Sequence, residues 1–365
     1  MCQATFRAIA GLAANDQVNQ EKFNSFPSLC KILVKALYNE LESEEVSRWG
    51  CAAISALATK NQSNQIKLGF AGNYLADIID THKTSPIITK EALKAISALA
   101  HGSSKNRTIL GAADACESLS KIFTTFADND EIIILAIKAT ADLSANNPHN
   151  QSRLGNAGVC EALVQSVITR KSNKGSEKLL IKWFCWAVGN IVQIVKSLAV
   201  AESSGKTKNA NRLLQSGVAE VLIYITKQYK DDPVIVQWVS RAINNLCKSR
   251  QLKAKFINLK APDILPKFTE SYAKNKDIIY WVKLAVDTLD APVESSSPDS
   301  RNVDTPPAPQ KRSSKTTTNT NANTNTNKFA TPSAGGGSSS SSSAAAAAYG
   351  SPIVQSVNNN TDAVM

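Results

Sequence analysis

The chain lacks several features that would place it in a common functional class. Its three histidines are scattered, and its seven cysteines form no Cys-x-x-Cys pair, which argues against a metal site and a disulfide framework. No stretch approaches the roughly 18 consecutive apolar residues of a membrane span. The N-terminus shows no charged segment followed by an apolar run, so we expect no signal peptide. These absences predict a protein of a reducing compartment, cytoplasmic with nuclear access left open.

Motifs of catalysis are also missing. The sequence contains no nucleophile elbow, no phosphate-binding loop and no paired-carboxylate motif. The segment 203–207 shares only the end of a Walker A motif, without its upstream glycine or preceding strand. We therefore predict that the protein is not an enzyme and uses no cofactor or metal.

Charge and complexity divide the chain at residue 292. The sequence has 41 Lys and Arg against 30 Asp and Glu, a net charge of +11. Residues 292–365 hold five basic and four acidic residues, so ten of these net charges lie in residues 1–291. The same segment contains a Thr/Asn run, six consecutive serines and five consecutive alanines, with too few large apolar residues to offset the entropy of ordering. We predict a folded region over 1–291 and a disordered tail over 292–365.

An internal repeat runs through the folded region. Seven segments with helical periodicity align without gaps, each with an alanine in the second position and Leu or Ile in the sixth. The segments are 7–12, 52–57, 94–99, 138–143, 186–191, 241–246 and 284–289, and their alanines are Ala8, Ala53, Ala95, Ala139, Ala187, Ala242 and Ala285.

A second block lies between these helices. It reads Asn-x-x-x-Leu-Gly in the copies that start at Asn64, Asn106 and Asn150 and Asn-x-x-x-Leu-Leu in the copy at Asn209, and weaker copies start at Asn19 and Leu252. The starts are separated by 45, 42, 44, 59 and 43 residues. Three residues after this motif, a glycine predicts a sharp turn into another apolar helix. At the positions of Asp114, Pro27 and Lys260, which replace that glycine, we expect the turn to be built differently.

The three-helix unit, its Asn-x-x-x-Leu-Gly-x-x-Gly lead-in and its Ala-hydrophobic-x-x-Leu third helix resemble the armadillo repeat family. The resemblance covers about residues 1–291 and implies an all-α, right-handed superhelical solenoid of about six to seven repeats. In that family the third helices line a concave groove.

Helical rotation of 100° per residue places four tryptophans in one column of the third helices, on the arc opposite the alanine core. A fifth, Trp186, lies on the same arc, and Trp186 with Asn190 is similar to the Trp/Asn pairing of the importin-α groove, where the asparagine pairs with ligand backbone amides. Two interpretations remain open: the rings bind partner segments, or they cover the neighbouring repeat as core. The candidate groove residues are Trp49, Trp183, Trp186, Asn190, Trp238, Arg241, Asn245, Trp281, Lys94 and Lys138.

The positive charge of this arc argues against an importin-like groove for basic peptides. The columns of this arc contain seven basic residues, Lys182 among them, and only two acidic residues, Glu91 and Asp142. A groove for basic peptides needs carboxylates, whereas this one resembles the basic groove of β-catenin-like proteins. We predict a non-catalytic scaffold that binds extended acidic or amphipathic segments of other proteins. Binding of nucleic acid or a phosphate-bearing ligand through the basic surface, or an importin-α-like cargo adaptor, are the alternatives.

Two irregular regions stand apart from the repeats. About 16 extra residues follow Asn190, and we expect an extended third helix and then an exposed loop over 203–208, either a binding element or a tolerated insertion. At the N-terminal end, the first recognisable element is already a third helix, with Ala8 and Leu12 on its core arc. We expect an apolar face there that contacts a second copy or a partner, unless Phe6 closes it or further chain precedes it.

Overall fold

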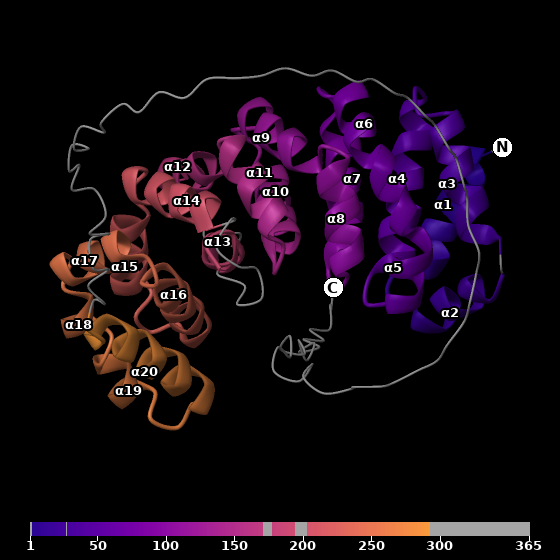
Figure 1. The fold of residues 1–365 in the computed structure, drawn as a ribbon. Coiled ribbons are helices and arrows are strands. Elements are labelled where there is room, and N and C mark those ends of the chain that lie inside the picture. Colours follow the sequence, from indigo (N-terminus) through magenta and orange to yellow (C-terminus); the bar gives the residue numbers. More distant parts are fainter. Residues whose placement is uncertain (1, 27, 171–176, 194–202, 293–365) are drawn as a thin grey trace, which may run out of the picture. The chain divides into compact units, whose positions relative to one another are not determined.

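The computed structural model describes residues 2–26, 28–170, 177–193 and 203–292, all within one compact unit, Met1–Ser296 (Figure 1). Within these residues the chain forms α-helices and one short 3₁₀ helix, η1 (Gly69–Ala71), and no strand. None of the described helices is long and apolar enough to cross a bilayer. The predicted disordered tail lies outside the described residues from 293 onward.

The helices repeat in threes. The first helices are α2 (Gln17–Ser25), α5 (Gln62–Leu68), α8 (Ser104–Ala112), α11 (Pro148–Asn156), α14 (Ser203–Gln215) and α17 (Arg250–Asn258). The second helices are α3 (Leu29–Asn39), α6 (Gly72–Thr81), α9 (Ala115–Thr125), α12 (Val159–Thr169) and α15 (Val218–Gln228), followed by the pair α18 (Ala261–Ile264) and α19 (Lys267–Ser271). The third helices are α1 (Cys2–Ala13), α4 (Glu44–Ala58), α7 (Pro86–Ala100), α10 (Asp130–Ser144), α13 (Glu177–Ile191), α16 (Pro233–Leu246) and α20 (Lys276–Asp290).

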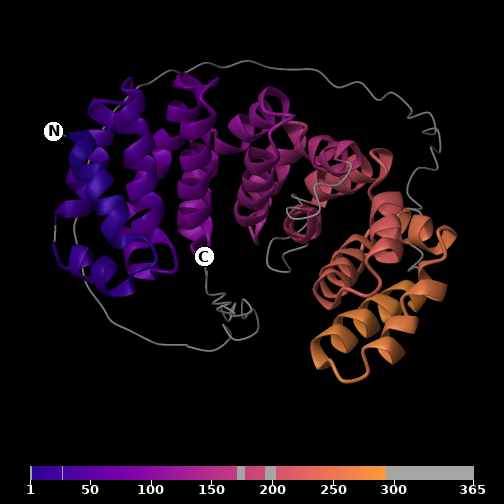
Figure 2. The ribbon, with the colours of Figure 1, turned by 180° about the vertical axis from the view of Figure 1, so that it is seen from behind.

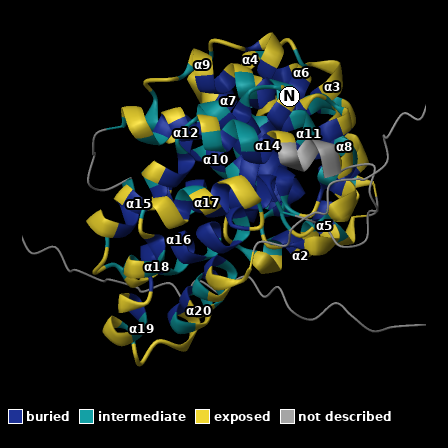
Figure 3. Cartoon of the chain, turned by 60° about the vertical axis from the view of Figure 1, so that its left-hand side comes forward, coloured by how far each residue is buried: buried dark blue, intermediate teal, exposed yellow. Residues whose placement is uncertain are grey.

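Each third helix packs on the third helix of the next repeat, from α1 to α20 (Figures 1 and 2). All seven aligned segments fall inside these helices, which confirms that prediction. From Ala53 to Ala285 the alanine column is at most 1% exposed, because a small side chain lets neighbouring helices approach closely. Burial therefore continues from repeat to repeat through α10, α14 and α16, whereas α19 is largely exposed (Figure 3).

An asparagine in the first helix joins consecutive repeats. Asn106 Nδ2 donates to two carbonyl oxygens of the preceding repeat, that of Gln65 in its first helix (2.8 Å) and that of Leu99 in its third helix (3.0 Å). The equivalent asparagines of three other blocks make the same pair of bonds. We call each of these residues an asparagine latch: Asn64, Asn106, Asn150 and Asn209. One of the two bonds of each latch satisfies a carbonyl in the last turn of a third helix, where intrahelical backbone donors are missing.

The glycine of the Asn-x-x-x-Leu-Gly motif makes room for the latch of the next repeat. A Cβ atom on Gly155 would lie 1.7 Å from Asn209 Oδ1, and the equivalent Cβ atoms would meet Asn106 and Asn150 just as closely. Where the next repeat has Leu252 in place of the asparagine, the glycine position is occupied by Leu214. This glycine is therefore required for packing, a role that the motif alone did not reveal.

The turn into the second helix corrects one prediction. Gly158 and Gly217 adopt left-handed φ angles of 85° and 86°, as a sharp turn requires. Asp114 and Lys260 adopt the same left-handed backbone, with φ of 59° and 64°, so the expectation of a different turn at these positions was wrong. The third turn glycine, Gly72, is instead right-handed (φ −54°), because η1 carries the chain into α6 without a break.

The insertion after Asn190 also differs from the expectation. The helix α13 ends at Ile191, and residues 194–202 lie outside the described residues. Residues 203–208 were expected to form an exposed loop, but they form the first part of α14. The helical conformation extends there because α14 continues into a packed face, on which Asn209, Ala210 and Leu213 are buried.

At the N-terminal edge, α1 exposes side chains whose equivalents in the later third helices are buried. Leu12 is 56% exposed, whereas the equivalent residues of the six later third helices are at most 3% exposed. Ala8 is likewise exposed. Asn19 Nδ2 donates to the carbonyl oxygen of Leu12 in α1 (2.9 Å), as each latch does to its third helix, and its other bond goes to Asp16 Oδ2 (2.9 Å). Leu12 and Ala8 are therefore open at this edge, whereas Phe6 and Ile9 of the same helix are buried.

Candidate functional site

The tryptophans of the predicted column lie on the third helices as expected. Trp49 is on α4, Trp183 and Trp186 are on α13, Trp238 is on α16 and Trp281 is on α20. Trp238 is 8% exposed, and the other four are half-buried. Trp49, Trp183 and Trp186 also pack against the hydrophobic core. The core interpretation therefore holds for Trp238 and in part for Trp49, Trp183 and Trp186, and binding of partner segments by the half-buried rings stays a prediction.

Three of these rings form one cluster. Trp183 and Trp186 are stacked, with ring centroids 5.3 Å apart and an interplanar angle of 20°. Trp186 also lies against Trp238, with centroids 5.7 Å apart. Residues 183 and 186 are neighbours on one helix face, and 238 comes from the adjacent helix α16. The three indoles form a continuous aromatic surface across two repeats.

Cations of the chain alternate with the indoles along this surface. Lys182 Nζ lies 5.1 Å from the ring centroid of Trp183 and 5.7 Å from that of Trp238. The guanidinium carbon of Arg241 lies 5.3 Å from the Trp238 centroid and 5.1 Å from that of Trp281. Lys138 Nζ adds a contact to Trp183 at 5.3 Å. We call these six residues the indole ladder: Lys138, Trp183, Lys182, Trp238, Arg241 and Trp281. Contacts of this kind place each cation on the electron-rich face of a ring.

The earlier repeats use their groove cations differently. Lys94 forms an ion pair with Glu91 (2.8 Å), and Lys90 forms one with Glu131 (2.7 Å). Both lysines therefore have a carboxylate of the chain itself as a counter-charge. The lysine ammonium groups of α7 are neutralised within the protein.

Trp49 lies in a similarly satisfied environment. Its indole nitrogen donates to Glu45 Oε2 (3.0 Å), and Arg48 covers its ring at 4.7 Å while also pairing with Glu45. Arg7 lies over the same ring at 5.3 Å.

A buried carboxylate marks the boundary between the two parts of this face. Asp142 is 2% exposed and lies 3.0 Å from Lys138 Nζ and 3.1 Å from His101 Nδ1. The His101 ring in turn meets Trp186 edge-on, with centroids 6.3 Å apart. Sequence reasoning counted Asp142 only as a groove charge, because nothing in its repeat indicated that His101 from the preceding repeat would reach it.

The two asparagines of the candidate groove lie in different environments. Asn190 is 3% exposed, and its Nδ2 donates to the carbonyl oxygen of Ala141 (3.0 Å) in the last turn of α10. The same carbonyl also accepts from Ser144 Oγ (3.2 Å), so the buried Asn190 amide joins α13 to the end of α10, whereas the sequence predicted it on the open groove. Asn245 is half-exposed and accepts a hydrogen bond from Lys248 (3.2 Å).

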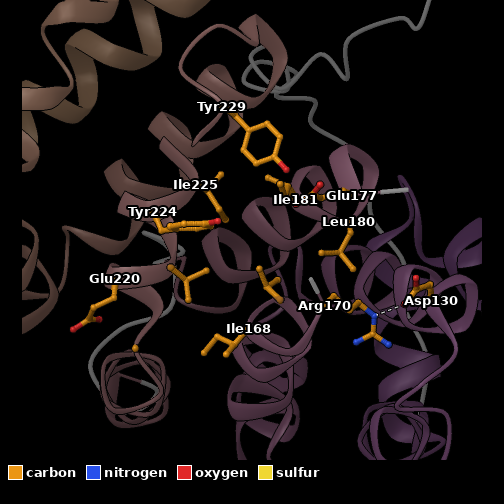
Figure 4. Close-up of a pocket in the computed structure, with 13 residues that line it drawn as sticks. Asp130, Ile168, Arg170, Glu177, Leu180, Ile181, Glu220, Tyr224, Ile225 and Tyr229 are labelled. Carbon is orange, nitrogen blue, oxygen red and sulfur yellow. Dashed lines mark hydrogen bonds and ion pairs between the residues drawn. The ribbon is translucent and has the colours of Figure 1, made fainter. Parts of the chain in front are cut away.

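A cavity of about 560 Å³ opens on another face of α13 (Figure 4). Its walls are mainly aliphatic, with Leu180 and Ile181 from α13 and Ile225 from α15. An ion pair between Arg170 and Asp130 (2.8 Å) closes one end. Nothing in the sequence analysis indicated this cavity. Among the described residues, no cluster of three His, Cys, Asp or Glu could hold a metal ion.

Comparison with known proteins supports the fold. No protein-family model and no curated protein matches the chain. Solved structures do match: an engineered protein with a TM-score of 0.65 is 20% identical over 79% of this chain, and the matched part is 64% of that protein's length. A designed armadillo repeat protein in complex with the peptide (KR)4 has a TM-score of 0.57 and is 22% identical, covering 71% of this chain and 98% of its own. A second designed armadillo repeat protein has the same TM-score and identity, over 71% and 99% of the two chains. The chain thus has an armadillo-like, all-helical repeat fold.

Proposed function

We propose that the chain is a non-catalytic protein-binding scaffold that receives extended acidic or amphipathic segments of partner proteins on its third-helix face. The observation that supports this most strongly is the indole ladder. Its rings of Trp183 and Trp281 are half-buried beside cations, and tryptophan and arginine are typical of the residues that dominate binding energy at protein interfaces. Their succession over α13, α16 and α20 suits a segment that lies across several repeats.

The sign of the charge favours an acidic partner over a basic one. The designed neighbour in complex with (KR)4 binds a peptide of alternating lysine and arginine. In the present chain, Lys182 and Arg241 already lie against the rings of the ladder. A basic peptide would bring like charges together there, whereas an acidic segment would meet opposite charge.

The test is a titration of the full chain with three fluorescent ligands: a mixed Glu/Leu peptide, (KR)4, and a single-stranded DNA 20-mer. We expect the acidic peptide to bind, (KR)4 not to bind, and DNA to bind only at low salt, because contacts to phosphate are lost as salt rises. The variant Lys182→Glu/Arg241→Glu should lose the acidic peptide. The matched control is Lys227→Glu/Lys230→Glu, which changes the net charge equally on two exposed residues, at the end of α15 and just after it.

Each unexpected result points to another function. Tight binding of (KR)4 would favour the importin-like adaptor. DNA binding that survives 300 mM salt would favour the nucleic-acid alternative. Equal losses in the ladder variant and its control would mean that only net charge matters and would reject the ladder as the site.

A further inference from the structure

Lys182 differs from the lysines of the earlier groove repeats in having no counter-charge. Lys90, Lys94 and Lys138 each pair with a carboxylate within 3.0 Å. Lys182 forms no ion pair with any described residue, although it lies at the centre of the ladder. Its side chain is half-buried, and this burial lowers the pKa of its ammonium group. Burial thus removes part of the hydration of the Lys182 ammonium group, and no carboxylate of the described residues forms an ion pair with it.

The surroundings of Lys182 would strengthen an interaction with an incoming anion. Trp183 and Trp238 flank its ammonium group, and Trp186 lies against both rings. Aromatic surface lowers the local dielectric constant, so a charge pair interacts more strongly there than on an open surface. The aromatic walls would also bury apolar atoms that neighbour the anion in the ligand.

We propose that Lys182, Trp183, Trp186 and Trp238 form an anion-binding cup that takes a single carboxylate or phosphate group from a segment whose neighbouring side chains are apolar. This inference rests on the proposed function and narrows it, since it separates such a segment from a run of acidic residues. A run of carboxylates would bring several charges against three indoles, with Lys182 between the rings and Arg241 as the next cation of the ladder, so most of its charges would lose water without gaining a partner. An isolated anion between apolar residues avoids that cost.

The experiment compares four synthetic peptides of equal length on the full chain. One has a single Glu between Leu and Phe residues, the second has Gln in its place, the third has phosphoserine there, and the fourth is a run of Glu. We expect the Glu peptide to bind at least tenfold more tightly than the Gln peptide and than the Glu run. The phosphoserine peptide distinguishes the two sources of the anion: the tighter of the two anionic peptides identifies the group that the cup takes.

Two variants assign this discrimination to Lys182. Lys182→Met keeps an apolar stem against the rings and should abolish the difference between the Glu and Gln peptides. Lys227→Met, the matched control, removes an exposed lysine near the end of α15, outside the candidate groove, and it should retain the difference. Lys182→Arg should recover part of it. Thermal unfolding of each variant checks that the fold is kept.

The outcomes separate the cup from the broader function. If the Gln peptide binds as tightly as the Glu peptide, or if Lys182→Met still discriminates, the cup is wrong. If the Glu run binds most tightly and Lys182→Met does not weaken it, the cup is wrong while the scaffold function stands. If none of the four peptides binds, the proposed function itself fails.

Discussion

The repeats up to α12 and those from α13 onward share one fold but use the same positions differently. In the earlier part, groove lysines are neutralised internally, as Lys94 is by Glu91. In the later part, Lys182 and Arg241 lie between indole rings. The latches extend one helix set further: Asn209 of α14 is the last, and Leu252 takes the equivalent place in α17. Groove lysines paired with carboxylates therefore characterise the first part, and cations placed against indole rings characterise the second.

The largest expected effect concerns the stacking of the first part. In Gly155→Ala, the added Cβ would meet Asn209 Oδ1, so the latch must leave its position and lose two hydrogen bonds. We expect a loss of about 3 kcal/mol in the free energy of unfolding, measured by urea denaturation. Gly11→Ala is the control, since nothing lies within 4 Å of its added Cβ and alanine favours a helix.

A double variant makes this test more specific. Because Asn209→Ala removes the atom that clashes, Gly155→Ala/Asn209→Ala should cost clearly less than the sum of the two single changes. Additive costs would show that the glycine and the asparagine act independently, and the latch would then not explain the glycine.

The next largest effect should separate the two parts of the groove in binding. Trp238→Leu keeps apolar volume but removes the ring that Lys182 and Arg241 contact. We expect it to weaken an acidic peptide by about 2 kcal/mol, roughly 30-fold. Trp49→Leu should weaken it by less than threefold, because Glu45 already occupies the indole nitrogen of Trp49. Equal losses in fluorescence-anisotropy titrations would contradict the division of the groove.

These cases show how far the sequence alone could predict the structure. The third helices were predictable because alanine recurs in one column wherever two helices pack closely, as at Ala53 and Ala187. The roles of Gly155 and Asn190 were not predictable in this way, because each depends on an atom of a neighbouring repeat. Aligning the repeats shows which residue types recur at one position, but not which atoms of the neighbouring repeat contact them. The same limit kept Lys182 out of the candidate site.

A smaller effect on stability is expected at the N-terminal edge, where the repeat position of Leu12 is exposed although the same position is buried in the later third helices. We propose that the open apolar face around Leu12 lets the chain self-associate. Leu12→Ser should reduce association in light scattering across a dilution series while lowering the free energy of unfolding by no more than about 0.5 kcal/mol. Leu57→Ser, in the same column but 1% exposed, should cost several-fold more. A wild-type mass that is monomeric at every concentration would show that this edge is closed without a partner.

The smallest effect should appear in the order in which buried thiols become reactive. Burial raises the pKa of Cys160 and Cys247 to about 12, so at pH 8 roughly one thiol in ten thousand at these sites is ionised. In the native protein we expect Ellman's reagent to reach only Cys2, slowly, because its hydrogen bond with Glu40 raises the pKa of that thiol. In low urea, Cys247 should react before Cys160, because no asparagine latch joins α17 to the preceding repeat, whereas Asn150 and Asn209 hold the repeats on both sides of Cys160. Mass spectrometry of the labelled peptides measures the order. Simultaneous labelling of both thiols would mean that the two parts of the array unfold as one unit, and the difference between them would then be confined to recognition.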